Sequence, residues 1–122
     1  MPTIPAAMLK QLYQRGSLRN TGDGWQFTMR NHLASASLNG LAISLDGAVI
    51  PADAVRVAQG SGPAAPATGI SAEAPLWFAV GVDTVVQVAG APLAPGPHDL
   101  SIRADTREIG PVTIAARDTV AG

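Results

Sequence analysis

Large apolar residues recur at every second position in several short segments, and this alternation constrains the fold more than any other feature. It begins after Gly24, where Trp25, Phe27 and Met29 alternate with polar residues. A period of two is typical of a strand with one buried face, because successive side chains point to opposite sides. The same spacing returns at Leu41, Ile43 and Leu45; Val55 and Val57; Thr84, Val86 and Val88; Leu100, Ile102 and Ala104; and Val112, Ile114 and Ala116. Repeated short strands are predicted.

Turn-forming residues separate these segments. Asp46-Gly47 favours a tight hairpin, because both residues tolerate a positive φ. The corner at residues 93–98 is similar to the one that enters a late strand in many Ig-like sandwiches, where the ring of His98 would bond to nearby backbone. We therefore expect an all-β fold, an antiparallel β-sandwich of the Ig-like or jelly-roll-like kind, and the 122 residues fit one such domain.

The remaining segments set the domain organisation. We expect residues 1–8 to be a flexible lead-in and residues 9–122 to form the sandwich. Residues 6–14 fit a helix with an apolar face as well as they fit a first strand, and both alternatives stay open. Residues 58–75 are rich in Gly, Pro and Ala and are predicted to be a long loop. Loops of that length are usually functional or mobile.

Composition excludes several classes of function. The net charge is -1 and the basic residues form no runs, so we expect no nucleic-acid partner. The sequence has 0 cysteines, which excludes thiolate chemistry and Cys-based metal sites. No apolar run approaches the roughly 20 residues that cross a bilayer, so no membrane association is expected. A cytoplasmic location is the expectation.

No set of residues predicts chemistry in this chain. His98 is expected to be structural, and His32 is expected at a surface or interface, since no second histidine or carboxylate stands at ligand spacing. Most aspartates lie beside glycine or at strand ends, where short side chains cap turns. The sequence's aspartates are Asp23, Asp46, Asp53, Asp83, Asp99, Asp105 and Asp118. We predict no catalytic, cofactor-binding or metal-binding residues.

Two kinds of residue indicate a docking surface instead. Trp77 and Phe78 are adjacent, so in an extended segment one of them must point outward or into a partner. Aromatic and arginine side chains dominate interface hot spots. Two Arg-Asn pairs stand at segment ends, where arginine can bind carboxylates and asparagine can bind backbone; they could equally bridge loops within the sandwich. The candidate partner-interface residues are Arg19, Asn20, Arg30, Asn31, His32, Trp77 and Phe78.

Several stretches resemble the small β subunit of C-glycoside deglycosidases. They begin with residues 13–20 (Tyr-Gln-Arg-Gly-Ser-Leu-Arg-Asn) and continue with residues 23–31 (Asp-Gly-Trp-Gln-Phe-Thr-Met-Arg-Asn). The resemblance covers most of the chain from about Lys10 onward, and its most specific pieces are Gly-Ser-Leu-Arg-Asn and Arg-Asn. Further matching pieces are residues 45–47, 81–85, 93–98 and 110–112.

The resemblance implies a heteromeric lyase that cleaves the carbon-carbon bond between a 3-keto sugar and an aromatic, flavonoid-type aglycone. It implies that a large subunit, similar to a TIM barrel, carries the catalytic histidine and a divalent metal, with manganese expected. This chain would then be the non-catalytic small subunit with no cofactor of its own. The alternatives are a freestanding carbohydrate-binding module and a structural interaction module, and a sugar titration of the isolated chain separates the first of these from a subunit.

Overall fold

Antiparallel strands account for most of the chain, as the alternation predicts. The computed structural model describes residues 6–120. In chain order the elements are α1 (Ala6–Lys10), β1 (Arg19–Asn20), β2 (Gly24–Arg30), β3 (Ala36–Leu45), β4 (Ala48–Val49), the 3-10 turn η1 (Ala52–Ala54), β5 (Val55–Gln59), β6 (Ala65–Pro66), the 3-10 turn η2 (Ala67–Gly69), β7 (Leu76–Phe78), β8 (Asp83–Ala89), β9 (Gly96–Thr106) and β10 (Gly110–Val120).

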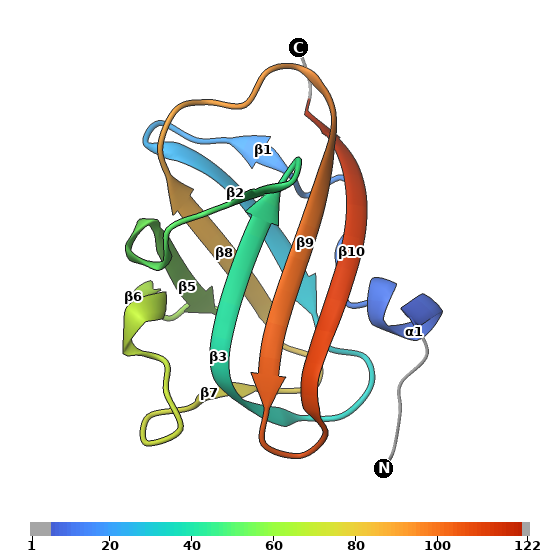
Figure 1. The fold of residues 1–122 in the computed structure, drawn as a ribbon, viewed down its shortest axis with the longest axis vertical. Helices are drawn as coiled ribbons and strands as arrows, with labels where there is room; N and C mark the ends of the chain where they lie inside the picture. The colour runs from blue at the N-terminus through green and yellow to red at the C-terminus, as the bar shows by residue number, and fades with distance from the viewer. Residues whose placement is uncertain (1–5, 121–122) are drawn as a thin grey trace.

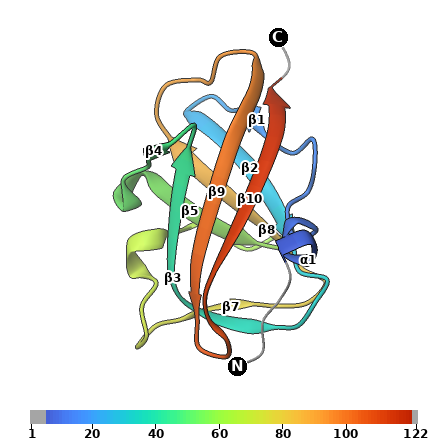
Figure 2. The ribbon, with the colours of Figure 1, turned by 45° about the vertical axis from the view of Figure 1, so that its right-hand side comes forward.

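The strands form two sheets that lie in two layers (Figures 1 and 2). The first sheet has the order β1-β2-β8-β5-β6, and the second has the order β10-β9-β3-β4, with β7 also paired to β3. The pairs between named strands are antiparallel. The predicted antiparallel β-sandwich is therefore confirmed.

The alternating residues of the first sheet point into the space between the layers. Trp25, Phe27 and Met29 of β2 are all buried, and so are Val86 and Val88 of the neighbouring β8. The rings of Trp25 and Phe27 stack with centroids 6.4 Å apart. Apolar burial on one face and polar side chains on the other fix the register, because a shift by one residue would exchange the two faces.

The second sheet contributes a row of isoleucines to the same core. Ile102 of β9 is opposite Ile43 of β3 on one side and Ile114 of β10 on the other. Their exposed fractions are 0%, 1% and 2% respectively. Full burial of such a side chain is worth roughly 1.5–3 kcal/mol, so this row is a major source of stability.

The N-terminal segment, for which the sequence allows a helix or a strand, begins as a short helix. Leu9, Leu12 and Tyr13 are buried, which fits the three-to-four-residue spacing of one helical face. Figures 1 and 2 both place α1 beside β10, at the edge of the second sheet. Of the expected lead-in at residues 1–8, residues 1–5 lie outside the described part, and α1 begins at Ala6.

The expected loop at residues 58–75 contains more structure than its composition predicts. β5 continues through Ala58 to Gln59, and the two-residue strand β6 pairs back onto it. The turn η2 then buries Ala67, and Ile70 packs against the core. The buried Ala67 and the partly buried Ile70 hold the segment against the sandwich, so the irregular stretches are short.

The Asp46-Gly47 turn connects β3 to β4 as predicted. Asp46 has φ 50° and Gly47 has φ 85°, the conformation that a tight two-residue hairpin requires. The return strand β4 is only two residues long, since Pro51 and η1 follow one residue after it. The hairpin therefore lies at the end of β3 opposite to the end that pairs with β7.

Candidate partner-binding site

The predicted interface residues lie at the two ends of β2 and do not form one cluster. Arg19 and Asn20 constitute β1, which pairs with the beginning of β2. Arg30 is the last residue of β2, and an isolated bridge from Asn31 to Val80 links that end to the segment after β7. The structure thus brings the second Arg-Asn pair close to β7 and leaves the first pair at the other end of β2.

Asn20 serves a loop within the molecule. Its amide Nδ2 donates to the Leu93 carbonyl at 3.0 Å, and its Oδ1 accepts from the Leu93 N–H at 2.7 Å. This double contact ties β1 to the corner that enters β9. Arg19 is exposed beside it. Asn20 therefore bridges loops within the sandwich, which is one of the two roles that the sequence allowed for the Arg-Asn pairs.

Arg30 pairs with an acidic neighbour across the first sheet. Its Nε lies 2.7 Å from Asp83 Oδ1, and the two residues are opposite each other in the β2–β8 register. Their side chains are 45% and 46% exposed. An ion pair that is this open to solvent contributes at most about 1 kcal/mol to stability, and half of each side chain stays accessible to a partner.

Asn31 and Phe78 were expected on the interface, and the structure places both inside instead. Asn31 is 2% exposed: its Nδ2 donates to the carbonyls of Ala34 at 2.8 Å and Phe78 at 3.0 Å, and its Oδ1 accepts from the Leu33 N–H at 3.0 Å. Phe78 is 6% exposed because it occupies the core-facing side of β7. Neither side chain can touch a partner in this conformation, so both are removed from the candidate surface.

Trp77 is the member of the aromatic pair that points outward. Its side of β7 faces solvent, and the residue is 55% exposed. Its carbonyl accepts from Gln59 Nε2 at 2.5 Å, so the backbone beneath the indole is fixed. Val80, three residues on, is 49% exposed, and His32 is exposed beside the bridge to Val80. We call the exposed residues at this end of the sandwich, Arg30 of the first sheet together with His32, Trp77 and Val80, the Trp77 surface.

His98 has the structural role that the sequence predicts. Its Nε2 lies 2.7 Å from the Ala94 carbonyl, and its Nδ1 lies 2.6 Å from Asp46 Oδ2. Both partners accept hydrogen bonds, so this arrangement favours the charged imidazole, which carries a proton on both ring nitrogens. The Ala94 carbonyl and then the Asp46 carboxylate raise the pKa of His98. The ring holds the corner at residues 94–98 against the hairpin.

Asp118 is an important residue that the sequence interpretation misplaced. It does not cap a turn but lies within β10, is 7% exposed, and accepts at Oδ2 from the Tyr13 hydroxyl at 2.7 Å and the Gly16 N–H at 2.8 Å. Burial alone would raise the pKa of this carboxyl, but the hydrogen bonds from Tyr13 and backbone N–H groups outweigh burial and lower it. The sequence does contain a signal for this burial, because position 118 continues the alternation of Ile114 and its neighbours.

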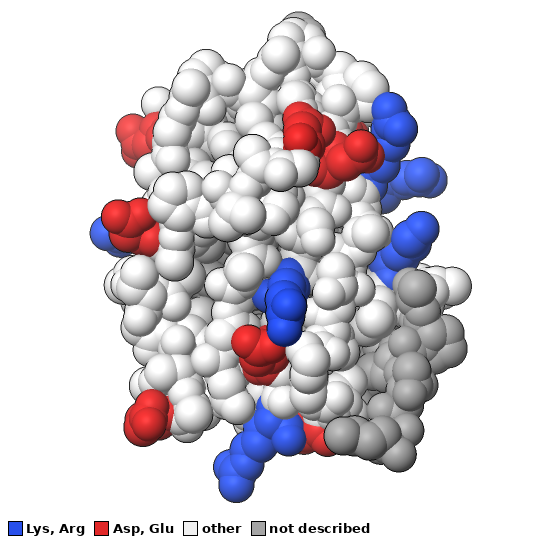
Figure 3. All heavy atoms as spheres, viewed as in Figure 1, with Lys and Arg blue, Asp and Glu red and all other residues white. Residues whose placement is uncertain are grey.

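The surface shows no concentration of one charge on the face that carries β3, β9 and β10. Figure 3 shows acidic and basic side chains next to each other in small groups there, with uncharged areas between the groups. Within residues 6–120, no three His, Cys, Asp or Glu side chains gather closely enough to hold a metal ion. In the same part of the chain, no helix is long and apolar enough to span a bilayer.

Comparison with known families gives one result. A family model described as the N-terminal domain of hydroxymethylglutaryl-CoA reductase matches residues 8–121. The chain belongs to this family. The match to the hydroxymethylglutaryl-CoA reductase N-terminal domain spans both sheets, so it concerns the whole sandwich rather than one motif. No curated protein matches the chain. The resemblance to the deglycosidase small subunit stays a prediction.

Proposed function

We propose that this chain is a non-catalytic accessory subunit that binds a larger catalytic chain through the Trp77 surface. The observation that carries the proposal is the 55% exposure of Trp77 on a strand whose backbone is fixed. Buried tryptophan anchors dominate the binding energy of many interfaces. A rigid backbone beneath the indole lowers the entropy that is lost when a partner covers it.

The polar groups of the sandwich support an accessory role because they are engaged in holding the fold. His98 is paired with Asp46 and a carbonyl, and Asp118 accepts from Tyr13 and from backbone. A general base needs a free acceptor within reach of the proton it removes. These groups are therefore assigned to stability, and the chemistry is assigned to the partner.

The sequence resemblance supplies the identity of the partner in this proposal. It is a TIM-barrel-like large subunit of a C-glycoside deglycosidase, which carries a divalent metal and a catalytic histidine and cleaves the carbon-carbon bond of a 3-keto C-glycoside in the cytoplasm. The chain would contribute binding surface and no reacting group. Its support is the Gly-Ser-Leu-Arg-Asn and Arg-Asn pieces around Arg19 and Arg30.

A second candidate is favoured by the family match over residues 8–121. In that case the sandwich would accompany the catalytic part of a hydroxymethylglutaryl-CoA reductase, again as a domain without chemistry of its own. Both candidates require the Trp77 surface to be covered by a catalytic chain, and they differ in which reaction the complex performs.

Reconstitution tests the proposal. A deglycosidase large subunit from the same genome is assayed alone and with this chain, and aglycone release from a 3-keto C-glucoside is followed by chromatography. We expect a stable complex and release that depends on this chain. Full activity of the large subunit alone would exclude the accessory role. Reductase activity in complex with a reductase catalytic part would favour the second candidate, and sugar binding by the isolated chain would favour a carbohydrate-binding module.

A further inference from the structure

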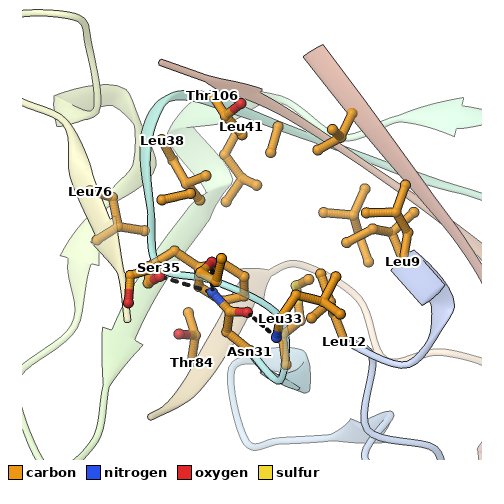
Figure 4. Close-up of a pocket in the computed structure, with 18 of the residues that line it drawn as sticks. Leu9, Leu12, Asn31, Leu33, Ser35, Leu38, Leu41, Leu76, Thr84 and Thr106 are labelled. Carbon is orange, nitrogen blue, oxygen red and sulfur yellow. Dashed lines mark hydrogen bonds between the residues drawn. The ribbon is translucent and has the colours of Figure 1, made fainter. Parts of the chain in front are cut away.

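An apolar cavity of about 130 Å³ lies between the two sheets, at the end of the sandwich where β7 pairs with β3. Figure 4 shows Leu38 and Leu41 on one side of it and Leu9 and Leu12 on the other. Both sheets and the N-terminal segment contribute to its wall. Protein interiors contain few voids larger than a water molecule, so a space of this size is unusual in a small domain.

The volume indicates the class of molecule that would fit. An engineered apolar cavity of about 150 Å³ in another protein stays free of water and binds benzene or xenon. The cavity here is similar in size and wall chemistry, and it is smaller than the several hundred Å³ of pockets for drug-sized ligands. A volume of about 130 Å³ fits one small ring.

Most polar groups in the wall are already occupied. The side chain of Asn31 makes three hydrogen bonds to nearby backbone. The hydroxyl of Thr106 donates to the Gly110 carbonyl at 2.7 Å and accepts from the Ile109 N–H at 3.1 Å. These groups maintain the wall and are not available to a ligand.

Thr84 differs from these polar groups because its side chain has no hydrogen-bond partner among residues 6–120. Figure 4 shows Thr84 below Leu38 and beside Asn31. It lines the cavity, is 4% exposed, and its Oγ1 is buried without a hydrogen-bond partner within the described residues. A buried hydroxyl without a partner is costly, and native structures rarely keep one without a reason. Position 84 lies on the core-facing side of β8, where Val86 and Val88 follow.

We propose that this cavity binds a small, mainly apolar molecule that carries one hydroxyl, such as a single phenolic ring, with the ring among the leucines and the hydroxyl paired to Thr84 Oγ1. The pairing would satisfy the one unpartnered side-chain group of the wall. The ring would fill space that the side chains leave open. This site is independent of the Trp77 surface and of any catalytic partner.

Titration of the full chain with benzene and with phenol, followed by methyl NMR, tests the proposal. We expect saturable shifts at Leu38, Val86 and Ile102 with both probes, and roughly fivefold tighter binding of phenol, because a hydrogen bond has about that net worth. Thr84→Val keeps the shape of the side chain and removes the hydroxyl. It should retain benzene binding and remove the preference for phenol.

A second experiment uses a variant with a larger side chain that fills the cavity. Ala104 lies in the cavity wall, between Leu41 and Val112 in the register of the second sheet. Ala104→Leu should occupy the space and abolish binding of both probes, whereas Ala115→Leu, at an exposed position of β10, should leave binding unchanged. No saturable shift with either probe up to its solubility would overturn the site. Equal binding of both probes by the wild type and Thr84→Val would overturn the role of the hydroxyl.

Discussion

At the scale of single residues, the polar side chains that matter most tie distant parts of the chain together. His98 joins a corner to a hairpin, and Asp118 joins the last strand to the segment that follows α1. The sequence allowed the first to be predicted, because a histidine in a strand-entry corner usually bonds to backbone. It did not show Asp46 as the second partner, since that residue is distant in the chain.

The charged state of His98 makes stability depend on pH. The pKa of His98 is raised in the folded state, so the stabilisation is complete below the unfolded value of about 6.5 and is lost as pH rises through the folded pKa. His98→Gln should therefore lower the urea midpoint more at pH 5.5 than at pH 9. The control is His32→Gln, which removes the other imidazole. An equal effect of His98→Gln at both pH values would contradict the charged pair.

Asp118 should be sensitive to substitution by its amide. Asp118→Asn leaves one oxygen for donors that now share the carboxylate, and its NH2 group would face the N–H of Gly16 or Thr119. We expect a loss of about 1–3 kcal/mol in the free energy of unfolding, measured with urea at pH 7. Asp99→Asn is the control, since that carboxylate is 69% exposed. Equal losses in the two variants would show that the buried contacts contribute nothing.

The dependence of the free energy of unfolding on acidic pH also reports on the contacts of Asp118. The pKa of Asp118 is lowered in the folded state. Its contribution is therefore present above the unfolded value of about 3.9 and is lost as pH falls through the folded pKa. The difference between the wild type and Asp118→Asn should shrink as the pH is lowered through that range.

At the scale of elements, the alternation of apolar residues in the sequence predicts the long strands but not the short ones. Leu100, Ile102 and Ala104 alternate over enough residues to define a buried face. β1, β4 and β6 have two residues each, which is too few for any period, and they form because a neighbouring strand offers free backbone groups. The outward direction of Trp77 was likewise open, since either aromatic could occupy the core face until β7 was paired with β3.

The isoleucine row gives a prediction about strand packing. Ile102→Val removes one methylene from the centre of the row and should lower the free energy of unfolding by about 0.5–1.5 kcal/mol, because the surroundings relax only partly around the gap. Arg103→Ala, at the exposed next position of β9, should change it by less than about 0.5 kcal/mol. Urea unfolding of both variants measures the contrast. A neutral Ile102→Val would mean that the two sheets pack loosely at this point.

The pairing of β2 with β8 allows the role of Arg30 to be separated from that of its neighbour. If Arg30 serves only the cross-strand pair, Arg30→Ala and Asp83→Ala should affect complex formation equally. We expect Arg30→Ala to weaken association with the catalytic chain by about tenfold and Asp83→Ala to have a smaller effect, measured by calorimetric titration. Equal effects would assign Arg30 to the fold alone.

At the scale of the whole molecule, both proposed sites lie at one end of the sandwich, and the contacts that tie loops together lie at the other. The Trp77 surface and the apolar cavity both lie where β7 pairs with β3, whereas the Asp46-Gly47 hairpin and the His98 contact lie at the opposite end of β3. The sequence predicted the two-layer fold and named Trp77, but it grouped residues from both ends of β2 into one surface. Only the paired strands show that Arg19 and Arg30 are separated.

The affinity of this chain for the proposed catalytic partner, measured by calorimetry with Trp77→Ala and Val49→Ala, tests the central claim most directly. Val49 is the matched control because it is 76% exposed and lies on β4, at the other end of β3. We predict that Trp77→Ala raises the Kd by about thirtyfold, the effect of an interface hot spot, and that Val49→Ala changes it by less than about twofold. An unchanged Kd for Trp77→Ala, or the absence of any complex, would contradict the account.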